Sequence, residues 1–426
     1  MAVRGHHVVI LHPRATRRGS VYLAVFALAM LALVIGLGGM MSARVQARDA
    51  ALAADAAAAR ANAYSAVELG RLWILQDPSW RTTKAGPSWI ASQPFGDGTI
   101  SVDVTNPLGA LARSSLDPVV MVGTGTRGGA RQKLRVTLTP SPVALSCLNA
   151  AWCAGGSISV SKTLTGPGLV VATNANFSAN SATVNADVEA TGSATGSAYA
   201  GSKKSGVAAR ALPSITSVLA EYALLGSTGS FSGIPRISGN WTVQNVLIGP
   251  SSAPFGAAPR ANGVYILDCG GKALVMQNLR VVGTIVLVNC GGLSLKGPIN
   301  WSPAVANYPC LIVQGSLTID QDAASLVEST VAVNLNPSST PFPYPSGTSN
   351  ATTTDYYTCG INGLVYVSGG VTINNAGWSL GTVLANGSIS ANESVTIVPC
   401  PKYAASPPPG FADVKMLATA WEQAVD

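Results

Sequence analysis

The chain has 426 residues, and only 11% of them are charged, whereas 45 are glycine. Its formal net charge of +7 is concentrated at the start, because the segment before Gly19 carries four arginines and no acidic residue. In the rest of the chain the net positive charge is spread too thinly to form the basic surface of a nucleic-acid-binding protein. No histidine occurs after His12, so Ser-His-Asp triads and histidine metal sites are excluded from the rest of the chain.

An uncharged segment follows these arginines. Residues 19–43 carry no charged side chain, and their apolar part, residues 21–41, would reach about 32 Å as a helix, which matches the hydrocarbon thickness of a bilayer. This length favours a retained membrane helix over a removed signal peptide or a buried core helix. Because the basic residues lie mainly before the segment, we expect a single pass through the inner (cytoplasmic) membrane, in contact with lipid. The N-terminus would be cytoplasmic and the C-terminal part exported.

The helix is predicted to continue well beyond the membrane. No proline occurs between residues 20 and 76, and the alanine-rich second half of this range has a strong helix propensity. One helix over residues 20–76 would be about 85 Å long. The alternative is a membrane helix and a separate short helix, with a break near Gly36, Gly38 and Gly39. Residues 1–19 would form a basic cytoplasmic leader.

Residues 77–142 are expected to form a small antiparallel β domain. In "GDGTISVDVTNP" the apolar residues Ile100, Val102 and Val104 alternate with polar neighbours. Two further short β-segments follow at close spacing, "PVVMVGTGT" and "ARQKLRVTLTP". This alternation is typical of a meander with one buried face.

Residues 143–400 are predicted to form a parallel β-solenoid, with a right-handed β-helix as the expected form. Short β-segments alternate with glycine and asparagine, and "DCGGKALVMQN" from Asp268 is echoed by "NCGGLSLKG" from Asn289. A period of about 20 residues is typical of such coils. The proline-rich residues 336–357 should leave the coil as an excursion. Residues 401–426 should form a proline-rich tail and a short helix that caps the solenoid. The fold class is therefore mostly β with one long N-terminal α-helix.

The cysteines all lie at or after Cys147, on the side that should be exported, where disulfides persist. Cys147 and Cys153 lie close in sequence, and Cys269 and Cys290 are one repeat apart. Stacked rungs about 4.8 Å apart would bring the latter two and Cys310 near one another. We predict that at least one of the pairs Cys147–Cys153 and Cys269–Cys290 is a disulfide. The alternative is that the cysteines pack as small apolar residues.

The N-terminal residues resemble those of a known family. Arg17, Arg18 and Gly19 precede an aliphatic run from Ser20 and a helical stem that ends in "AYSAVELGRLWIL". These features resemble type IV pilin-class proteins, most closely the minor pilins and pseudopilins of the PilX and GspK type. The resemblance implies that a prepilin peptidase cuts between Gly19 and Ser20, and that other pilin-like subunits are partners. Major pilins usually have a glutamate where this chain has Ala24, which implies a tip or minor subunit and not a shaft subunit.

The C-terminal part carries a second resemblance. The segments "NGVYILDCGGKALVMQNLRVVGTIVLVN", "INGLVYVSGGVTI" and "PPPGF" are similar to parts of bacterial proteins of unassigned activity that join a pilin-like stem to a β-helix. This resemblance implies an architecture and no chemistry.

β-Helices also host polysaccharide lyases and hydrolases, whose sites need clustered carboxylates. The candidates here are Asp320 and Asp322, which alternate on one strand, joined by Asp268. A solvated pair at a turn is the more ordinary interpretation. Three tryptophans would either stack on sugars or pack in the coil: Trp241, Trp301 and Trp378.

We therefore predict no catalytic site, no cofactor and no metal site. The expected function is that of a membrane-anchored, pilin-like structural or surface protein that presents a β-solenoid head. It would be a minor subunit of a type IV pilus or a type II secretion pseudopilus. The alternative is a membrane-tethered β-helix protein that binds or cleaves carbohydrate, with polysaccharide as its partner.

Overall fold

The computed structural model describes residues 17–232, 234–237, 239–253, 255–320, 325–341, 348–375, 378–398 and 402–424. Most of the expected leader, Asp322 and Cys400 lie outside the described residues. The chain divides into two compact units, and the division falls inside strands β4 (Ala130–Ala144) and β31 (Ala412–Ala424).

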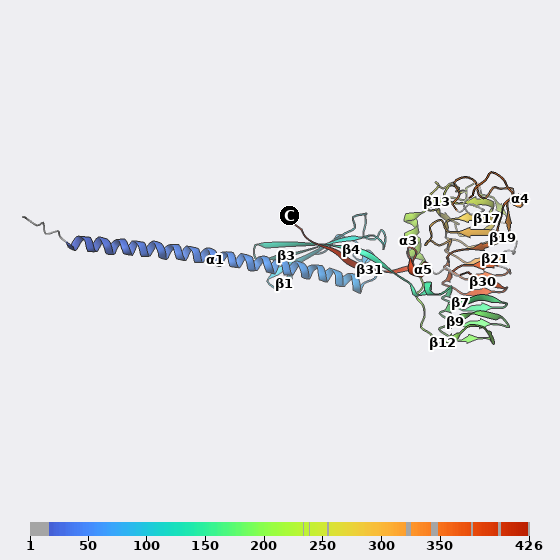
Figure 1. Ribbon diagram of the computed structural model, residues 1–426, viewed down its shortest axis with the longest axis horizontal. Helices are drawn as coiled ribbons and strands as arrows, with labels where there is room; N and C mark the ends of the chain where they lie inside the picture. Colours follow the sequence, from blue (N-terminus) through green and yellow to red (C-terminus); the bar gives the residue numbers. More distant parts are fainter. Residues whose placement is uncertain are drawn as a thin grey trace, which may run out of the picture. The chain divides into compact units, whose positions relative to one another are not determined.

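Helix α1 (Arg17–Gln76) runs without interruption for 60 residues, which confirms the prediction of one long helix (Figure 1). It does not break at the glycines near its middle. Its first part exposes apolar side chains, whereas Ala59, Ala63 and Val67 are buried. The helix is therefore packed against the rest of its unit only through its C-terminal part. A single helical turn, α2 (Trp80–Thr83), follows it.

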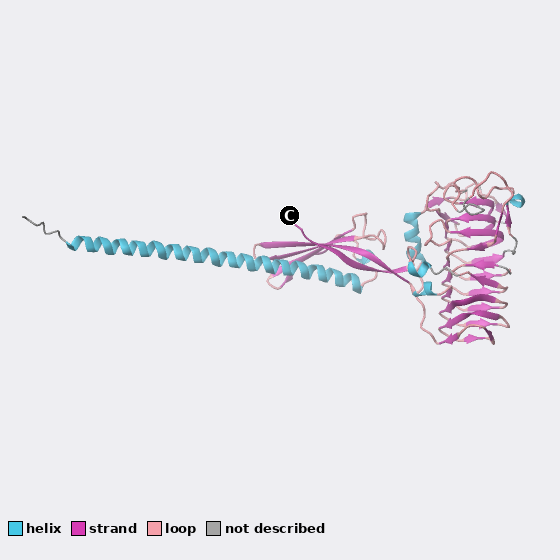
Figure 2. Cartoon of the chain, viewed as in Figure 1, coloured by secondary structure: helices cyan, strands magenta, loops and turns pink. Residues whose placement is uncertain are grey.

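The packed part of α1 lies on an antiparallel sheet with the strand order β1-β2-β3-β4-β31 (Figure 2). Glycines make a close approach possible, because Gly123 and Gly125 of β3 face the helix. A Cβ on Gly123 would lie 2.6 Å from the carbonyl oxygen of Ala63, and one on Gly125 would meet the carbonyl oxygen of Ala59. The sheet therefore seats the helix backbone directly on β3. The remaining strands are β1 (Ser88–Phe95), β2 (Gly98–Thr105) and β3 (Val119–Arg127).

The tail differs from the expected capping helix. One turn, α5 (Lys402–Ala405), is helical, but Ala412–Ala424 form strand β31 at the edge of the sheet, next to β4. The hydroxyl of Thr419 donates to the carbonyl oxygen of Thr137 at 3.3 Å. Exposure alternates along "ADVKMLATA" with the period of a strand. Pairing with β4 therefore outweighs the helix propensity of the alanine, methionine and leucine residues in this segment.

The second unit is a parallel β-solenoid, as the sequence predicts, and Figure 2 shows its strands stacked along the coil. The strand pairings place each full rung in three stacks. The rung of β28, β29 and β30 illustrates the register. It pairs with β25, β26 and β27 on one side and with β5, β6 and β7 on the other. All of these pairings are parallel, so the backbone hydrogen bonds run along the coil axis.

The rungs are not stacked in chain order. β5 and β6 lie between β28 and β29 on one side and β7 and β8 on the other. The chain thus enters the coil in the middle and runs to one end at β12. It then returns through helix α3 (Ile215–Leu225) to the opposite end at β13. Figure 1 shows this as the label order β13, β17, β19, β21, β30, β7, β9, β12 along the coil.

The first stack contains β13 (Ser227–Gly229), β16 (Val264–Asp268), β18 (Thr284–Val288), β20 (Leu311–Val313), β25 (Val365–Val367), β28 (Val383–Ala385), β5 (Trp152–Ala154), the ends of β7 (Leu164–Thr173) and β9 (Thr183–Ala190), and β12 (Lys203–Ser205). The second stack contains the first parts of β15 (Asn240–Ile248), β17 (Ala273–Val282) and β19 (Gly292–Ser302), then β21 (Leu317–Asp320), β26 (Val371–Ile373), β29 (Ile389–Ala391), β6 (Ile158–Val160), β8 (Phe177–Ala179) and β10 (Ala194–Thr195). The third stack contains the ends of β15 (Asn240–Ile248), β17 and β19, then β24 (Gly360–Ile361), β27 (Trp378–Leu380), β30 (Val395–Ile397), the start of β7, the start of β9 (Thr183–Ala190) and β11 (Ala198–Tyr199). Short elements outside the stacks are the 3₁₀ helix η1 (Ser146–Asn149) and β14 (Arg236–Ile237).

Valine, isoleucine and leucine line the inside of the coil, as expected. Leu293, Leu317, Val371 and Ile389 follow one another in register on successive rungs, and all are buried. Trp301 is also fully buried, and its indole N–H donates to the carbonyl oxygen of Gly283 at 3.0 Å. This tryptophan is a core residue and is not available for stacking on a sugar.

Between β21 and β24 the described residues leave the coil and form a small sheet of their own, from β22 (Leu326–Val327) and β23 (Tyr356–Tyr357). Residues 342–347 of the predicted excursion lie outside the described residues. A short helix, α4 (Glu328–Val331), follows β22. The buried carboxylate of Glu328 accepts hydrogen bonds from the backbone N–H of Leu335 at 2.7 Å and from the hydroxyl of Tyr357 at 3.1 Å. The described part of the excursion is therefore organised around a buried acid that is well supplied with donors.

Candidate membrane helix and open solenoid face

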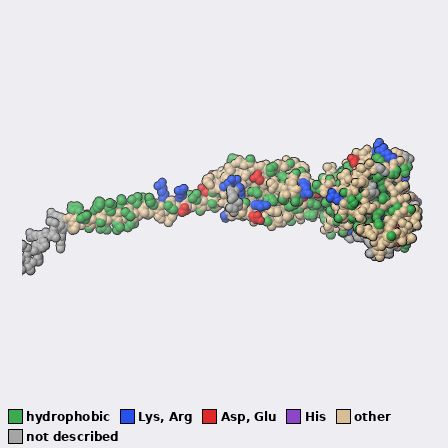
Figure 3. Space-filling view, turned by 90° about the horizontal axis from the view of Figure 1, so that it is seen from above, with side chains coloured by type: hydrophobic (Ala, Val, Ile, Leu, Met, Phe, Trp, Pro, Cys, Tyr) green, Lys and Arg blue, Asp and Glu red, His purple; other side chains and the backbone are tan. Residues whose placement is uncertain are grey.

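The first part of α1 is apolar, exposed and long enough to cross a membrane. Its most apolar window has no residue buried inside the structure. Figure 3 shows the hydrophobic side chains gathered along this part of the helix, with charged side chains beginning only beyond it. An exposed apolar surface of this length is larger than soluble proteins usually leave in water, and it is suited to contact with lipid or with other apolar helices.

Gly19 and Ser20 lie in the first turns of α1, at the start of this apolar segment, and both are exposed. A Cβ on Gly19 would meet no atom within 4 Å. Ala24 is exposed as well, so the structure places a small apolar side chain where the resemblance to pilins makes a glutamate usual. Cleavage between Gly19 and Ser20 stays a prediction.

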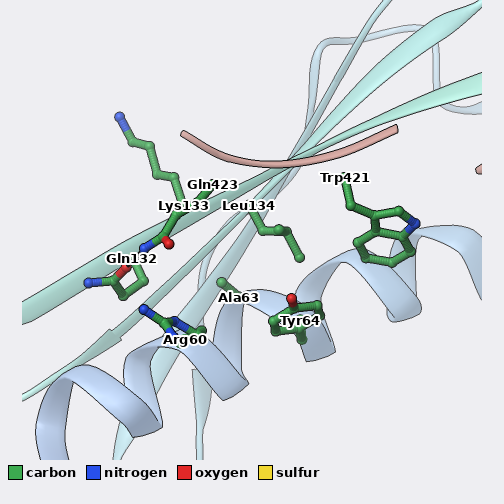
Figure 4. Close-up of a pocket in the computed structure, with 8 residues that line it drawn as sticks. All are labelled: Arg60, Ala63, Tyr64, Gln132, Lys133, Leu134, Trp421 and Gln423. Carbon is green, nitrogen blue, oxygen red and sulfur yellow. Dashed lines mark hydrogen bonds between the residues drawn. The ribbon is translucent and has the colours of Figure 1, made fainter. Parts of the chain in front are cut away.

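A small pocket lies in the first unit between α1, β4 and β31 (Figure 4). Its volume is about 120 Å³, which is below the usual size of a small-molecule site. The rings of Tyr64 and Trp421 stack across it with centroids 5.9 Å apart, and Gln423 donates to Gln132 at 2.8 Å. Its lining carries no carboxylate: Arg60, Ala63, Tyr64, Gln132, Lys133, Leu134, Trp421 and Gln423.

The two candidate carboxylates that the structure describes, Asp268 and Asp320, lie on different stacks, and Asp322 lies outside the described residues. Asp320 accepts a hydrogen bond from the side-chain amide of Asn374 at 2.7 Å, on the second stack. Asp268 ends a strand of the first stack, and its carboxylate accepts from the backbone N–H of Gly270 at 2.8 Å, as in an Asx turn. Among the described residues, no group of three metal-ligating side chains comes together.

The tryptophans do not form a platform for sugars among the described side chains. Trp241 stacks on Phe231, with ring centroids 5.1 Å apart, and the guanidinium of Arg236 lies 4.0 Å from its ring centre. Trp301 is buried in the coil. The side chain of Trp378 is outside the described set. The aromatic surface that would support sugar stacking is therefore not brought together by the described residues.

The two predicted cysteine pairs are buried and lie in different places. Burial raises the pKa of the Cys147 thiol to about 12 and that of Cys153 to about 11. Cys269 donates a hydrogen bond to the sulfur of Cys290, and this bond lowers the pKa of Cys290 and raises that of Cys269. All of these sulfurs are thiols in the structure. The hydrogen bond makes Cys269–Cys290 the better-placed pair for oxidation.

Cys310 does not join this pair, contrary to the expectation from repeat spacing. Its carbonyl oxygen accepts from the backbone N–H of Ile285, so it lies at the start of β18, whereas Cys290 follows the end of that strand. The two positions are separated by the length of the strand, about 15 Å. The nearly equal spacing of the three cysteines in the sequence is misleading, because the turn between β19 and β20 is longer than the turn between β17 and β18.

We predict that peptide mapping of the protein purified from the exported side without reductant will find the Cys269–Cys290 disulfide or the Cys147–Cys153 disulfide. An unstrained bridge would stabilise the coil by about 2–4 kcal/mol. Recovery of every one of these peptides as a free thiol would show that the prediction is wrong.

The three stacks of the solenoid differ in what covers them. On the middle rungs of the first stack, from β18 to β5, the outward side chain at the centre of each strand is apolar and buried beneath α3 and the segments beside it. These side chains are Cys153, Val286, Ile312, Tyr366 and Leu384. Toward the two ends of the coil the same position holds Thr228 on β13, Glu189 on β9 and Lys204 on β12. Helix α3 contributes Val218 and Tyr222 to the same cluster. We call this side the covered face.

From β19 to β10 the second stack carries hydroxyl side chains at the same central position, and we call this part the open face. Its central row is in register from rung to rung: Ser294, Thr318, Thr372, Ser390, Ser159, Ser178 and Thr195. On β17 the position is held by Val275. The side chains of the central row are half-buried among their neighbours or exposed. Within the described chain, no helix makes an extensive contact with these strands.

Two further rows of small polar residues flank the central row. The row before it is Ser316, Gly370, Ser388, Ser157, Asn176 and Ser193. The row after it is Lys296, Asp320, Asn374, Asn392, Ser161 and Asn180. Side chains bond along the rows, from Asn392 to Asn374 at 2.9 Å and from Ser159 to Ser390 at 3.2 Å. The open face is thus a regular array of hydroxyl and amide groups that are already partly ordered.

The open face is not evident in the sequence, because its serine, threonine and asparagine residues are as common in turns and loops as on a solenoid face. A usable signal was present in the middle residue of each short strand. The strands "LTI", "VTI", "ISA", "ISV" and "FSA" have a hydroxyl there, whereas "LIV", "VYV", "VLA" and "WCA" do not. The pattern is only partial, because "WSL" and a second "VTI" on the third stack also have a hydroxyl in the middle.

No family model and no curated protein matches the chain. Among solved structures, it is similar to a competence-associated pilin, ComZ, from Thermus thermophilus, with a TM-score of 0.33 and 11% identity over 87% of this chain and 98% of that chain. It is also similar to a glycosylated ice-binding protein (LeIBP) from an Arctic yeast, with a TM-score of 0.27 and 12% identity over 60% of this chain and 94% of that chain. TM-scores and identities this low do not establish a shared fold or function.

Proposed function

We propose that this chain is a membrane-anchored, pilin-like structural protein that presents a β-solenoid on the exported side of the inner membrane. The observation that carries the proposal is α1, whose first part is apolar and exposed while its C-terminal part is packed on an antiparallel sheet. The apolar first part of such a helix can lie in lipid or pack against other apolar helices, while its C-terminal part stays packed on the sheet.

The finer role is that of a minor subunit of a type IV pilus or a type II secretion pseudopilus. Ala24 supports this choice, because a subunit without a glutamate there lacks the charge that major pilins usually carry in the apolar segment. The basic residues before the apolar segment support a cytoplasmic N-terminus. The role is proposed as non-enzymatic, supported by the separation of Asp268 from Asp320. The carbohydrate-binding alternative has no comparable support, because the tryptophan and carboxylate side chains that are described do not gather on one face.

The proposal predicts the mature N-terminus. Intact-mass measurement and N-terminal sequencing of the protein from cells that contain a prepilin peptidase should find Ser20 as the first residue, in the membrane fraction. Gly19→Ala should slow the cleavage, because the added methyl group changes the residue at the cut bond. The apolar helix should remain attached after cleavage.

The matched control is the same protein from cells that lack the peptidase, in which residues 1–19 should remain attached. Recovery of the uncut chain from both kinds of cell would contradict pilin-like processing and leave a plain membrane anchor. Recovery of the folded protein from the soluble fraction would contradict membrane anchoring itself.

A further inference from the structure

We propose that Lys203 terminates the coil: it closes the end formed by β10, β11 and β12 and prevents a further strand from adding there. These three strands pair with the strands before them, β10 with β8 and both β11 and β12 with β9. The pairings of the described residues give them no partner on the other side. The tail that was expected to cap the solenoid forms β31 instead. This end is therefore an open edge of the kind that accepts another strand.

Lys203 stands at the end of a column of inward-pointing side chains. The pairings of the first stack align one such residue per rung, and the seven before Lys203 are apolar core residues: Ile285, Leu311, Val365, Val383, Trp152, Val171 and Val188. Lys203 is in register with the last of these, Val188. A lysine thus occupies, on the last rung, the position that an apolar side chain holds on each of the seven rungs before it.

The ammonium group of Lys203 lies over the end of the core. It donates to the carbonyl oxygen of Gly196 at 3.3 Å and lies 4.9 Å from the centre of the Tyr199 ring. Tyr199 is itself in register with the buried Val184, and its ring packs on that of Phe177 with centroids 6.2 Å apart. The aromatic ring therefore covers the apolar core, and an exposed cation covers the ring.

A further strand would have to bury this cation. It would lie about 4.8 Å beyond β12 and would remove water from the ammonium group of Lys203. Among the described residues no carboxylate pairs with Lys203, whereas the neighbouring Lys204 pairs with Glu189 at 3.3 Å. Burial of an unpaired charge is costly, and an inward-pointing charge is one of the means by which β-proteins block strand addition at an edge.

The opposite end of the coil is closed differently. There Phe231 and Phe255, from the chain between β13 and β16, are buried in the core cluster, and their ring centroids are 6.4 Å apart. A covering segment makes a terminating charge unnecessary at that end. The two ends therefore use different means to prevent the pairing of their edges.

Without Lys203, the strands most readily available to the open edge are those of an identical end. Two such ends can pair antiparallel across a two-fold axis. In the wild type this pairing would bring two Lys203 side chains together and bury both. Protection matters most where copies are tethered side by side, at an effective concentration in the millimolar range. Only this last point rests on the proposed membrane-anchored function.

The test uses the full chain in detergent micelles, examined by sedimentation velocity over a hundredfold range of concentration. Lys203→Met removes the charge from the end of the column and keeps a side chain of similar length. It should lower the apparent dissociation constant of self-association at least tenfold relative to the wild type. Lys204→Met is the matched control, because Lys204 is an exposed lysine in the same strand at an outward position. It should sediment as the wild type does, and any association through α1 is common to all variants.

Hydrogen exchange locates the new contact. In the associated Lys203→Met protein the backbone amides of residues 194–205 should exchange at least tenfold more slowly than in the wild type, because they are paired with another end. If Lys203→Met does not fold, Lys203→Gln takes its place, since its amide can still donate to Gly196. It should associate more strongly than the wild type.

Wild-type sedimentation of the folded Lys203 variants would overturn the proposal. Equal association of Lys204→Met would also overturn it, because the effect would then belong to surface charge and not to the inward position. Association without slower exchange at residues 194–205 would place the contact elsewhere and overturn it as well. The mature N-terminus and the membrane fraction are read separately, so none of these results bears on the proposed function.

Discussion

Val286→Asp is expected to unfold the solenoid. Val286 is only 1% exposed and lies on the covered face, in the cluster that joins the coil to α3. A carboxylate at this position would be buried without a partner, which is among the few single changes that cost more than about 4 kcal/mol. Urea denaturation of the full chain in detergent, followed by far-ultraviolet circular dichroism, should show loss of the β-signal at a much lower concentration than in the wild type.

Two further measurements separate the buried charge from the lost volume. Val286→Ala removes the same packing without a charge and should cost clearly less than the aspartate. Burial would raise the pKa of the new carboxyl group above its unfolded value, so the folded variant binds more protons than the unfolded one. Its stability should therefore rise as the pH falls toward the unfolded pKa. In the wild type, position 286 has no titratable group, so it contributes no such pH-dependent gain in the free energy of unfolding.

Lys272→Asp provides the surface control. Lys272 is exposed in the turn after Gly271. An aspartate introduced there stays in water, so it should shift the unfolding midpoint little. Equal damage from both substitutions would contradict the assignment of Val286 to a buried cluster. Equal tolerance would contradict the solenoid with α3 packed on its first stack.

Helix α1 was readily predicted, because a long proline-free, alanine-rich segment leaves no competing structure. The rungs were also predictable, since short β-branched strands between glycines permit few other folds. The order of the rungs was not. Strands such as "VLA" and "WCA" offer nearly the same side chains to a neighbour, so local pattern does not say that β5 stacks on β28. That choice depends on how the whole coil closes with α3.

In the C-terminal tail, the local sequence pattern predicts the wrong secondary structure. Its alanine, methionine and leucine residues favour a helix locally, and only the free edge of β4 makes β31 the better solution. The two candidate functional features also differ in how far the sequence predicts them. Gly19 and Ser20 were found from a short motif, whereas the open face depends on which stack α3 covers. The middle residues of the strands indicate that two kinds of face exist, but the contact with Val218 and Tyr222 decides which one is closed.

Gly125→Ala is expected to loosen α1 from its sheet. The added Cβ would meet the carbonyl oxygen of Ala59 and the backbone nitrogen of Ala63, and neither can move without shifting the helix. Overpacking of this kind costs about 1–3 kcal/mol, and a contact with helix backbone belongs at the upper end of that range. Limited proteolysis in detergent should cleave β3 or the start of the sheet faster than in the wild type, and Gly125→Val should show a larger effect.

Gly129→Ala is the matched control, because Gly129 lies in the turn between β3 and β4 and a Cβ there would meet no atom within 4 Å. Its backbone is not in the left-handed region that favours glycine, so the alanine variant should be digested at the wild-type rate. Equal protection of Gly125→Ala and Gly129→Ala would contradict the close seating of α1 on β3. Since Gly125 touches only the packed part of the helix, membrane association through the exposed apolar part should be unchanged in every variant.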